Sequence, residues 1–373
     1  MKQTVRTILF LLSVTGLFLL SLFIKTPEKK SAPAVSESKS VERPAYAKKI
    51  FVPNEWAPLK ETVLGTPLML THLVCDDEKK TANAESDAAR KPSDDAERFC
   101  RIKTVEESAP DFYEQLAAEL KNLENVLTEN GVRVSLHNPE ILSDEELFYR
   151  RDINRGVNFL QARKPVLIVG DTVMETASSS DMLSGKFSLR RILSFLMQMD
   201  GEAVLISMPE PSPQYPPDGI YLDSSNVLVD GRDVYVGTVG GQENKGALWL
   251  KNVLKKTHRV HAVSLKEGRF LDDVLAFIGP KTLIMEKDAF FDTLPDSLKN
   301  HRKIEISAQD NTFGLSDMLI LNPKKIVLNE KNEFLKNLLQ REGFETIGLP
   351  LDALVQTKTT LREVYHPIKR AVE

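Results

Sequence analysis

Short apolar runs recur along this chain, each beside a Gly, Pro or Asp turn, and they constrain its fold more than any other feature. Five such segments begin at Val63, Val166, Val227, Leu275 and Met318. A second apolar run follows most of them, and turn residues between short β-branched runs are typical of β-hairpins. Helical patterns lie between the segments, at 110–130, 187–199, 246–257 and 331–341. Repeated strand–strand–helix units predict a mixed α/β fold and favour a pseudo-five-fold ring of α/β modules.

The amino terminus carries an uncharged apolar run, residues 8–24, between Lys2 and Arg6 on one side and Lys25 on the other. As a helix, its 17 residues span roughly 26 Å, slightly less than the hydrocarbon thickness of about 30 Å. Three interpretations stay open: an uncleaved membrane anchor, which we favour, a cleaved signal peptide, or a buried core helix. The flanking charges do not settle the orientation. We expect residues 1–24 to direct export, with the soluble domain periplasmic or extracellular.

Residues 25–48 are rich in Lys, Ser, Pro, Glu and Ala and contain almost no bulky apolar residue. Such a segment cannot bury enough surface to offset the entropy of ordering it, so it is predicted to be a flexible linker. The folded domain is therefore expected to span residues 49–373.

Two cysteines, Cys75 and Cys100, flank a polar insertion at 76–99 that is almost entirely Asp, Glu, Lys, Ala, Ser and Thr. A stretch of this composition has little to add to a core and is expected to loop into solvent. In an exported domain the thiols meet an oxidising compartment, so we predict a disulfide bond at the base of the loop, worth about 3 kcal/mol by loop entropy. The alternatives are two unrelated core cysteines and, less favoured, a nucleophilic role.

Composition argues against several functions. The formal net charge is −4, whereas nucleic-acid-binding proteins usually carry a basic excess, so no nucleic acid is expected. The six histidines are scattered without carboxylate or Cys partners at ligand spacing, and no metal is expected. Gly240-Gly241 lacks the Lys-Ser/Thr of a phosphate loop, so nucleotide binding is not expected and no cofactor is implied.

Five blocks, in order along the chain, resemble the motifs of the glycine amidinotransferase family. The first reads NEWAPLKE followed by VLG, where the family shows EW-D-PL-E, a short strand and Gly. The next three are similar to the family's PRD–LLVVG–IIEAP, FDAADFI–GRDIFV and RVHIISFKD…HID, and the last to NVLVL–KVV–LE–GF–VPL. The blocks occupy residues 54–65, 162–175, 222–236, 259–272 and 317–351. The resemblance thus covers nearly all of residues 50–360.

This resemblance implies the five-bladed α/β propeller of the guanidino-group-modifying enzymes. It also implies the family's chemistry, in which a Cys thiolate attacks the guanidinium carbon and forms a covalent amidino-thioether. A His transfers protons, an Asp orients that His, and a further carboxylate binds the guanidinium through paired hydrogen bonds.

Part of this machinery is present in the chain. The guanidinium-binding Asp corresponds to Asp223, and the Asp that orients the His corresponds to Asp272. Arg163 and Glu175 also match the family's second block. The resemblance therefore makes Asp223, Arg163 and Glu175 the candidate substrate-binding residues.

Other parts are replaced. The family's His falls on Phe270, the Asp of the second block falls on Lys164, and a second Asp near Asp223 is Asn226. A lysine at position 164 reverses the charge and should repel a guanidinium. An internal salt bridge from this lysine to Asp223 or Asp272 is one alternative.

The nucleophile is the largest gap. The family's Gly-rich segment with its Cys falls on residues 354–361, which contain neither Gly nor Cys, and Thr359 or Thr360 stands nearest to the sulfur position. An unassisted Thr hydroxyl is a much weaker nucleophile than a thiolate. Both cysteines of the chain lie far upstream.

Three functional interpretations follow. We favour an envelope-anchored, catalytically degenerate amidinotransferase-like protein, a pseudoenzyme that binds a small guanidino or amino-acid ligand or a protein partner. The alternative is an active amidinotransferase or guanidino hydrolase with a rearranged site, whose candidate catalytic residues are Asp223, Asp272 and Thr360. In the third interpretation the resemblance misleads, and the chain is a different exported α/β domain.

Overall fold

The computed structural model describes residues 48–68, 70–75, 100–138, 158–177, 185–209, 219–239, 244–266 and 268–371. The predicted anchor at 1–24, nearly all of the predicted linker and the insertion at 76–99 lie outside the described residues. Lys48, the last residue of that linker, is buried, and its ammonium lies 2.6 Å from the carboxylate of Asp171. The folded part therefore includes position 48. In the described part of the chain, no helix has both the length and the apolar character that a bilayer span requires.

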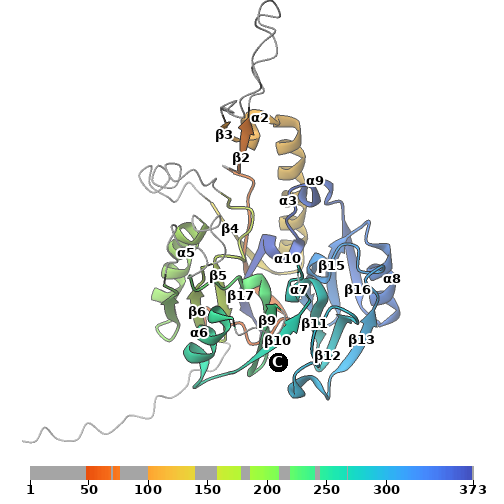
Figure 1. Cartoon of the computed structure of the whole chain (residues 1–373). Coiled ribbons are helices and arrows are strands. Elements are labelled where there is room, and N and C mark those ends of the chain that lie inside the picture. The colour runs from red at the N-terminus through yellow and green to blue at the C-terminus, as the bar shows by residue number, and fades with distance from the viewer. Residues whose placement is uncertain are drawn as a thin grey trace, which may run out of the picture. The chain divides into compact units, whose positions relative to one another are not determined.

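Within these residues, five three-stranded sheets share one topology (Figure 1). In four of them, two strands that follow each other form an antiparallel hairpin, and a third strand lies parallel to the second. The strands of these four sheets are β5 (Val166–Val169), β6 (Thr172–Glu175) and β7 (Val204–Ser207); β8 (Val227–Asp230), β9 (Asp233–Val239) and β10 (Arg259–Leu265); β11 (Leu275–Gly279), β12 (Thr282–Glu286) and β13 (Arg302–Ile306); β14 (Met318–Asn322), β15 (Lys325–Asn329) and β16 (Glu345–Leu349). The mixed α/β class and the hairpins predicted from Val166, Val227, Leu275 and Met318 are confirmed.

The fifth sheet joins the two ends of the described chain. Its order is β17 (Tyr365–Arg370), β1 (Leu59–Leu64) and β4 (Arg133–Leu136). β1 is antiparallel to β17 and parallel to β4, so this sheet repeats the topology of the other four. The prediction that Val63 begins a local hairpin is wrong, because its antiparallel partner is His366, at the other end of the sequence.

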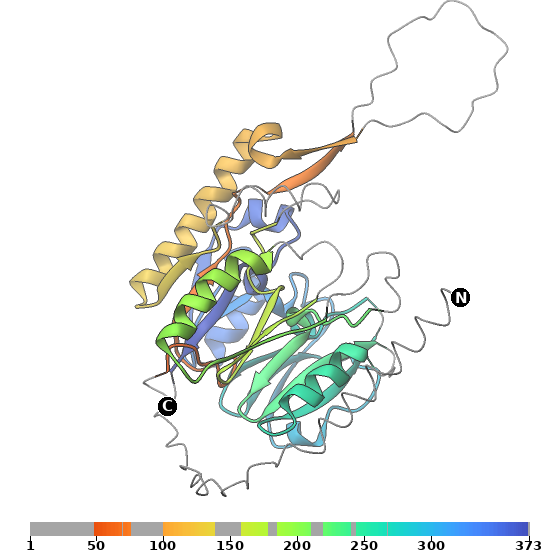
Figure 2. The same cartoon turned by 90° about the vertical axis from the view of Figure 1, so that its left-hand side faces the viewer.

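Helices supply most of the crossover connections that parallel strands need. They are α3 (Pro110–Glu129), α5 (Gly185–Met199), α6 (Lys245–Leu254) and α8 (Glu333–Arg341), while the connection from β12 to β13 contains the short 3₁₀ helix η5 (Asp296–Leu298). These long helices lie outside the sheets (Figures 1 and 2). α3 buries Leu116, Leu120, Leu123 and Leu127, which share one face of the helix.

A separate ribbon carries the two cysteines. β2 (Thr71–Cys75) and β3 (Cys100–Thr104) pair in antiparallel fashion and lead into α2 (Val105–Ser108) and α3. The register places the backbone of Cys75 opposite that of Cys100. Opposed Cα atoms in such a pair are about 4.5–5.5 Å apart, within the range that a disulfide bond spans. The bond itself remains a prediction.

A short segment precedes the first strand of each sheet, and these segments position the functional residues. They are residues 158–165, η4 (Ser224–Asn226), α7 (Leu271–Val274), η6 (Leu315–Asp317) and α10 (Leu361–Val364), which follows α9 (Asp352–Gln356). Hydrogen bonds join them: the Arg163 N–H donates to the Glu363 carbonyl (3.0 Å), and the Leu271 N–H donates to the Asn226 amide oxygen (2.8 Å). Figure 1 shows α7 and α10 between the sheets.

Candidate ligand-binding site

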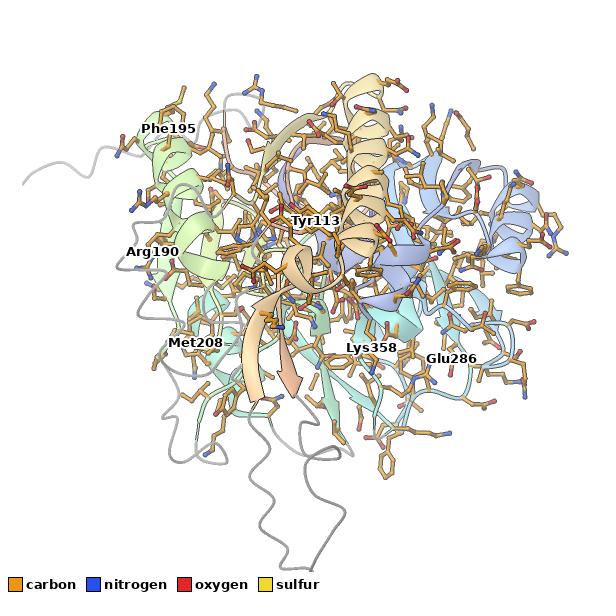
Figure 3. All side chains as sticks on the ribbon, turned by 90° about the horizontal axis from the view of Figure 1, so that it is seen from above. Tyr113, Arg190, Phe195, Met208, Glu286 and Lys358 are labelled. Atoms are coloured by element: carbon orange, nitrogen blue, oxygen red, sulfur yellow. The ribbon has the colours of Figure 1, made fainter. Side chains whose placement is uncertain are left out.

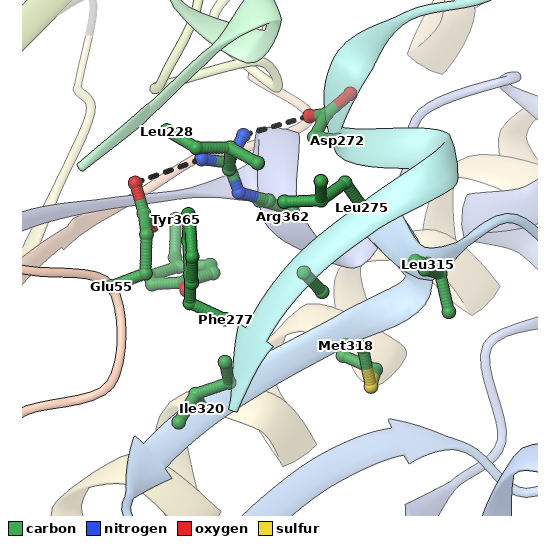
Figure 4. A pocket seen from close by; sticks show the side chains of 11 residues that line it. Glu55, Leu228, Asp272, Leu275, Phe277, Leu315, Met318, Ile320, Arg362 and Tyr365 are labelled. Carbon is green, nitrogen blue, oxygen red and sulfur yellow. Dashed lines mark hydrogen bonds and ion pairs between the residues drawn. The ribbon is translucent and has the colours of Figure 1, made fainter. Parts of the chain in front are cut away.

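A chain of buried ion pairs connects segments from different sheets. Arg362 donates from Nη1 to Asp272 Oδ2 (2.8 Å) and from Nη2 to Glu55 Oε1 (3.1 Å), as Figure 4 shows. Arg163 donates from Nη2 to both oxygens of Glu55, at 3.0 and 3.1 Å. The side chains of Glu55, Arg362 and Asp272 are only 5%, 7% and 3% exposed. At this burial each charge depends on its partners rather than on water.

Burial and pairing give the two acids of this chain opposite pKa shifts. Burial raises the pKa of Glu55, but the charges of Arg163, Arg362 and Arg370 outweigh it and hold the pKa at about 2. Burial raises the pKa of Asp272 to about 8, against the lowering effect of the Arg362 charge. Glu55 is therefore an anion at neutral pH, whereas burial opposes the ionisation of Asp272 and the Arg362 charge favours it.

The inner side of Arg362 is closed to ligands. The cavity beside it has a volume of about 10 Å³, which holds roughly one water molecule. Most of its lining is apolar and includes Leu228 and Phe277 (Figure 4). A small molecule therefore has no room on this side.

Solvent contact increases at the ion pair between Lys164 and Glu363. The Lys164 Nζ lies 2.7 Å from Glu363 Oε1, and the two side chains are 17% and 11% exposed. The other oxygen of Glu363 accepts hydrogen bonds from the Thr360 N–H (2.9 Å) and from Gln161 Nε2 (3.4 Å). Thr360 and Glu363 form a capping box at the start of α10, which fixes the direction of this carboxylate.

Two further carboxyl groups, those of Asp223 and Asp273, border this ion pair. Asp223 directly precedes η4 and accepts a hydrogen bond from the Ser225 N–H (2.9 Å). Burial raises the pKa of Asp223, and the charge of Lys164 opposes this rise. Burial likewise raises the pKa of Asp273, whose Oδ1 accepts a hydrogen bond from the hydroxyl of Ser316. Carboxyl groups thus reach this centre from the segments before three different sheets.

Known proteins of similar sequence and fold are amidinotransferases and related enzymes. No family model matches the chain. A curated protein, the putative inosamine-phosphate amidinotransferase 2 of Streptomyces griseus, is 24% identical over 345 residues, which are 81% of this chain and 91% of that protein. Two solved structures each have a TM-score of 0.65 and match 87% of this chain and 98% of their own: an inosamine-phosphate amidinotransferase of Streptomyces griseus (19% identity) and an amidinotransferase of the saxitoxin biosynthetic pathway from Microseira wollei (15% identity). The chain is thus similar in sequence to one amidinotransferase and shares its fold with two solved ones.

A guanidino hydrolase shares the fold at greater distance. The dimethylarginine dimethylaminohydrolase of Pseudomonas aeruginosa, solved in complex with citrulline, has a TM-score of 0.53 and 13% identity. It matches 83% of this chain and 98% of its own length. The fold that the two proteins share therefore extends over most of this chain.

The structure places the residues that the amidinotransferase resemblance singled out in several different surroundings. Asp223 and Asp272 both border the Lys164 ammonium, whose pKa their charges raise. Arg163 pairs with the buried Glu55. The Thr360 hydroxyl accepts a hydrogen bond from the Glu363 N–H (3.4 Å), as a helix cap does.

Glu175 and Phe270 belong to other surroundings: Glu175 pairs with Arg190, and Phe270 directly precedes α7. Arg190 donates to both carboxylate oxygens of Glu175, at 2.5 and 2.7 Å, and the Ser207 hydroxyl donates to one of them. Arg190 comes from α5, which lies at the edge of the molecule in Figure 3. Phe270 is the N-cap residue of α7 and is 46% exposed.

Three residues of the centre were not assigned a role from the sequence: Glu55, Arg362 and Glu363. Lys164 forms the internal salt bridge that was considered, but with Glu363 rather than with Asp223 or Asp272. One local signal was available, because the T-x-x-E spacing from Thr360 to Glu363 is typical of a helix start.

Proposed function

We propose that this chain binds a small cation with a guanidino or amino group at the centre around Lys164, without the family's thiolate chemistry. The composition of the centre carries this proposal. Its carboxyl groups belong to Asp223, Asp272, Asp273 and Glu363, and its cations are Lys164 and Arg362. Carboxyl groups outnumber the cations, and an incoming positive charge favours their ionised forms. The centre is therefore better suited to a cation than to an anion.

The fold and the neighbours support the class of ligand. We infer that the five sheets form the five-bladed α/β propeller of the superfamily, since they share one topology and the two ends of the described chain complete the fifth. One solved neighbour with a TM-score of 0.53 holds L-arginine, and another holds citrulline. A guanidino compound of similar size is the ligand that we propose for this chain.

The proposal that thiolate chemistry is lost rests on the segment that leads into β17. This segment offers hydroxyl, guanidinium and carboxylate groups but no thiol. Thr360 acts as a helix cap, and among the residues that the structure describes no general base is hydrogen-bonded to its hydroxyl as an acceptor of its proton, so it is not in the setting of an activated nucleophile. Loss of the covalent nucleophile removes the pathway itself, and the remaining groups do not restore it.

The second candidate function is a guanidino-group transferase or hydrolase with a rearranged site. Two observations favour it: the similarity to 91% of the Streptomyces griseus protein, and the raised pKa of Asp272, about 8. A carboxyl group with this pKa suits proton transfer near neutral pH. In this candidate Asp223 binds the cation, Asp272 exchanges the proton, and Thr360 or an activated water molecule attacks.

Calorimetry with the full-length chain tests the proposed ligand class. We expect L-arginine to bind and the neutral analogue L-citrulline to bind at least about tenfold more weakly, because the carboxyl groups attract charge. Asp223→Asn is expected to weaken L-arginine binding by about tenfold or more. Asp296→Asn, at a carboxylate that is 88% exposed, is the matched control and should leave the affinity unchanged.

Mass spectrometry separates the two candidate functions. The chain is incubated with L-arginine and either glycine or water, and ornithine, citrulline and guanidinoacetate are sought. Binding without product supports the first function. Turnover that Asp223→Asn abolishes establishes the second, and failure of L-arginine to bind contradicts both.

We further propose that residues 8–24 anchor the chain in the cell envelope, with residues 49–373 on the exported side and Cys75 bonded to Cys100. The uncharged apolar run and the opposed register of the two cysteines support this arrangement. Alkaline extraction of membranes should leave the chain in the pellet, as it does for integral membrane proteins.

The disulfide is tested by peptide mapping without reduction, on protein recovered from its native membrane. We expect one linked peptide pair that contains Cys75 and Cys100. Loss of the bond in Cys75→Ser should lower the free energy of unfolding by up to about 3 kcal/mol, as loop entropy predicts. Recovery of two free thiols contradicts both the bond and the export that it implies.

A further inference from the structure

The backbone that carries Lys164 is held on several sides. The Arg163 N–H donates to the Glu363 carbonyl (3.0 Å), and the Arg163 carbonyl accepts a hydrogen bond from the Ser224 hydroxyl. The Lys164 carbonyl accepts a hydrogen bond from the Thr176 hydroxyl (2.9 Å). With its backbone fixed in this way, the lysine side chain starts from a defined position and reaches the carboxylate of Glu363.

The Lys164 ammonium stands among the carboxyl groups that we assign to ligand binding. It contacts Glu363 directly at 2.7 Å, and the charges of Asp223 and Asp272 act on it as well. Burial lowers the pKa of Lys164, but these carboxyl groups outweigh burial and raise it, so the side chain is positively charged. The ammonium thus makes the kind of contact that the guanidinium or amine of a ligand would make.

We propose that Lys164 is an internal competitor of the cationic ligand and occupies the ligand's position when the site is empty. This inference rests on the proposed function, because it requires a ligand that carries a positive charge. Ligand binding then requires the ammonium to leave Glu363, and the stability of that ion pair reduces the affinity. The side chain is 17% exposed, and its flexible four-carbon stem allows the ammonium to turn toward solvent.

An internal cation also affects which ligands bind. A charged ligand replaces the ammonium and restores the neutralisation of the carboxyl groups. A neutral ureido compound displaces the ammonium without replacing its charge, so Glu363 and Asp223 lose a partner. Lys164 therefore lowers the affinity for all ligands but lowers it more for neutral ones. Proteins commonly gain specificity in this way, by disfavouring the wrong ligand at some cost in affinity.

Removal of the Lys164 charge should tighten the binding of a small alkylguanidinium ion. We expect full-length Lys164→Met to bind N-propylguanidinium at least about tenfold more tightly than the wild-type chain, measured by calorimetry, since close charge pairs couple at least this strongly. Lys164→Arg keeps the cation and should bind no more tightly than wild type. The matched control is Lys121→Met, which removes a lysine that is 63% exposed and paired with Glu124 at 2.8 Å, and it should leave the affinity unchanged.

The outcomes separate this inference from the proposed function. Tighter binding by Lys164→Met alone supports the inference. Equal or weaker binding by Lys164→Met, with measurable wild-type binding, overturns the inference and leaves the proposed function in place. Absence of binding by both chains overturns both. Thermal melting by circular dichroism verifies folding, and Lys164→Gln, which retains a hydrogen-bond donor, replaces the Met variant if that variant does not fold.

Discussion

Arg362→Leu is expected to lower the free energy of unfolding by about 3–5 kcal/mol, the cost of leaving a buried charge without its partner. The Arg362 guanidinium joins Glu55 to Asp272 and also donates to the carbonyls of Val227 (3.1 Å) and Ser225 (3.3 Å). Leucine fills part of the volume but offers no donor. Arg163 still donates to both oxygens of Glu55 when Arg362 is lost, which favours the charged form of this carboxylate and leaves it buried with one partner fewer. Chemical denaturation of the full-length chain, followed by circular dichroism, measures the loss.

Arg259→Leu is the matched control for this prediction. Like Arg362, Arg259 donates two hydrogen bonds to carboxylate oxygens, here both of Asp233, at 2.7 and 2.6 Å, but its side chain is 68% exposed. Surface ion pairs contribute little because water replaces the lost partner. We therefore expect a much smaller change in stability than for Arg362→Leu. Comparable losses in the two variants would show that burial of the Arg362 pairs is not what stabilises the centre.

Four of the five sheets were predictable because each begins with a local hairpin. The turn at Gly231, with φ of 62°, needs a conformation that glycine adopts without strain, and short β-branched runs flank it in the sequence. The fifth sheet carries no such signal. β1 and β17 come from opposite ends of the chain, and no turn residue indicates that Val63 pairs with His366. Local chemistry identifies hairpins, whereas closure between distant strands depends on the whole fold.

Site residues that belong to a family motif could be predicted from the sequence. Residues whose role depends on a partner far away in the sequence could not. Asp223 and Asp272 were singled out by resemblance, and both border the Lys164 ammonium. The role of Arg362 depends on Glu55 and Asp272, residues that the sequence places far apart. Nothing in the local pattern indicates which buried carboxylate a buried arginine will meet. The partner of Lys164 was missed for the same reason.

His366 is expected to make the protein less stable in acid. Its imidazole is buried, and neither ring nitrogen has a hydrogen-bond partner among the described residues. Burial is the main cause that lowers its pKa from 6.5 to about 3, the charges of Arg163 and His137 lower it further, and Glu55 opposes them. Between these pH values the unfolded chain binds a proton that the folded chain does not, so the free energy of unfolding falls as the pH falls.

The variant His366→Leu tests this prediction, because it has no imidazole that could take up a proton on unfolding. At pH 5 the wild-type histidine is expected to cost about 2 kcal/mol relative to neutral pH, and the variant should lose that much less stability over the same interval. Glu55 and Asp272 titrate in both proteins, so their contributions cancel in the difference between the two pH profiles. Thr62→Val is the control: it removes the hydrogen bond from Thr62 to the His366 carbonyl (2.8 Å) without a titrating group, and its cost should not vary with pH. Parallel profiles for wild type and His366→Leu would mean that this imidazole is protonated inside the fold, with a carboxylate or water molecule near enough to stabilise its charge.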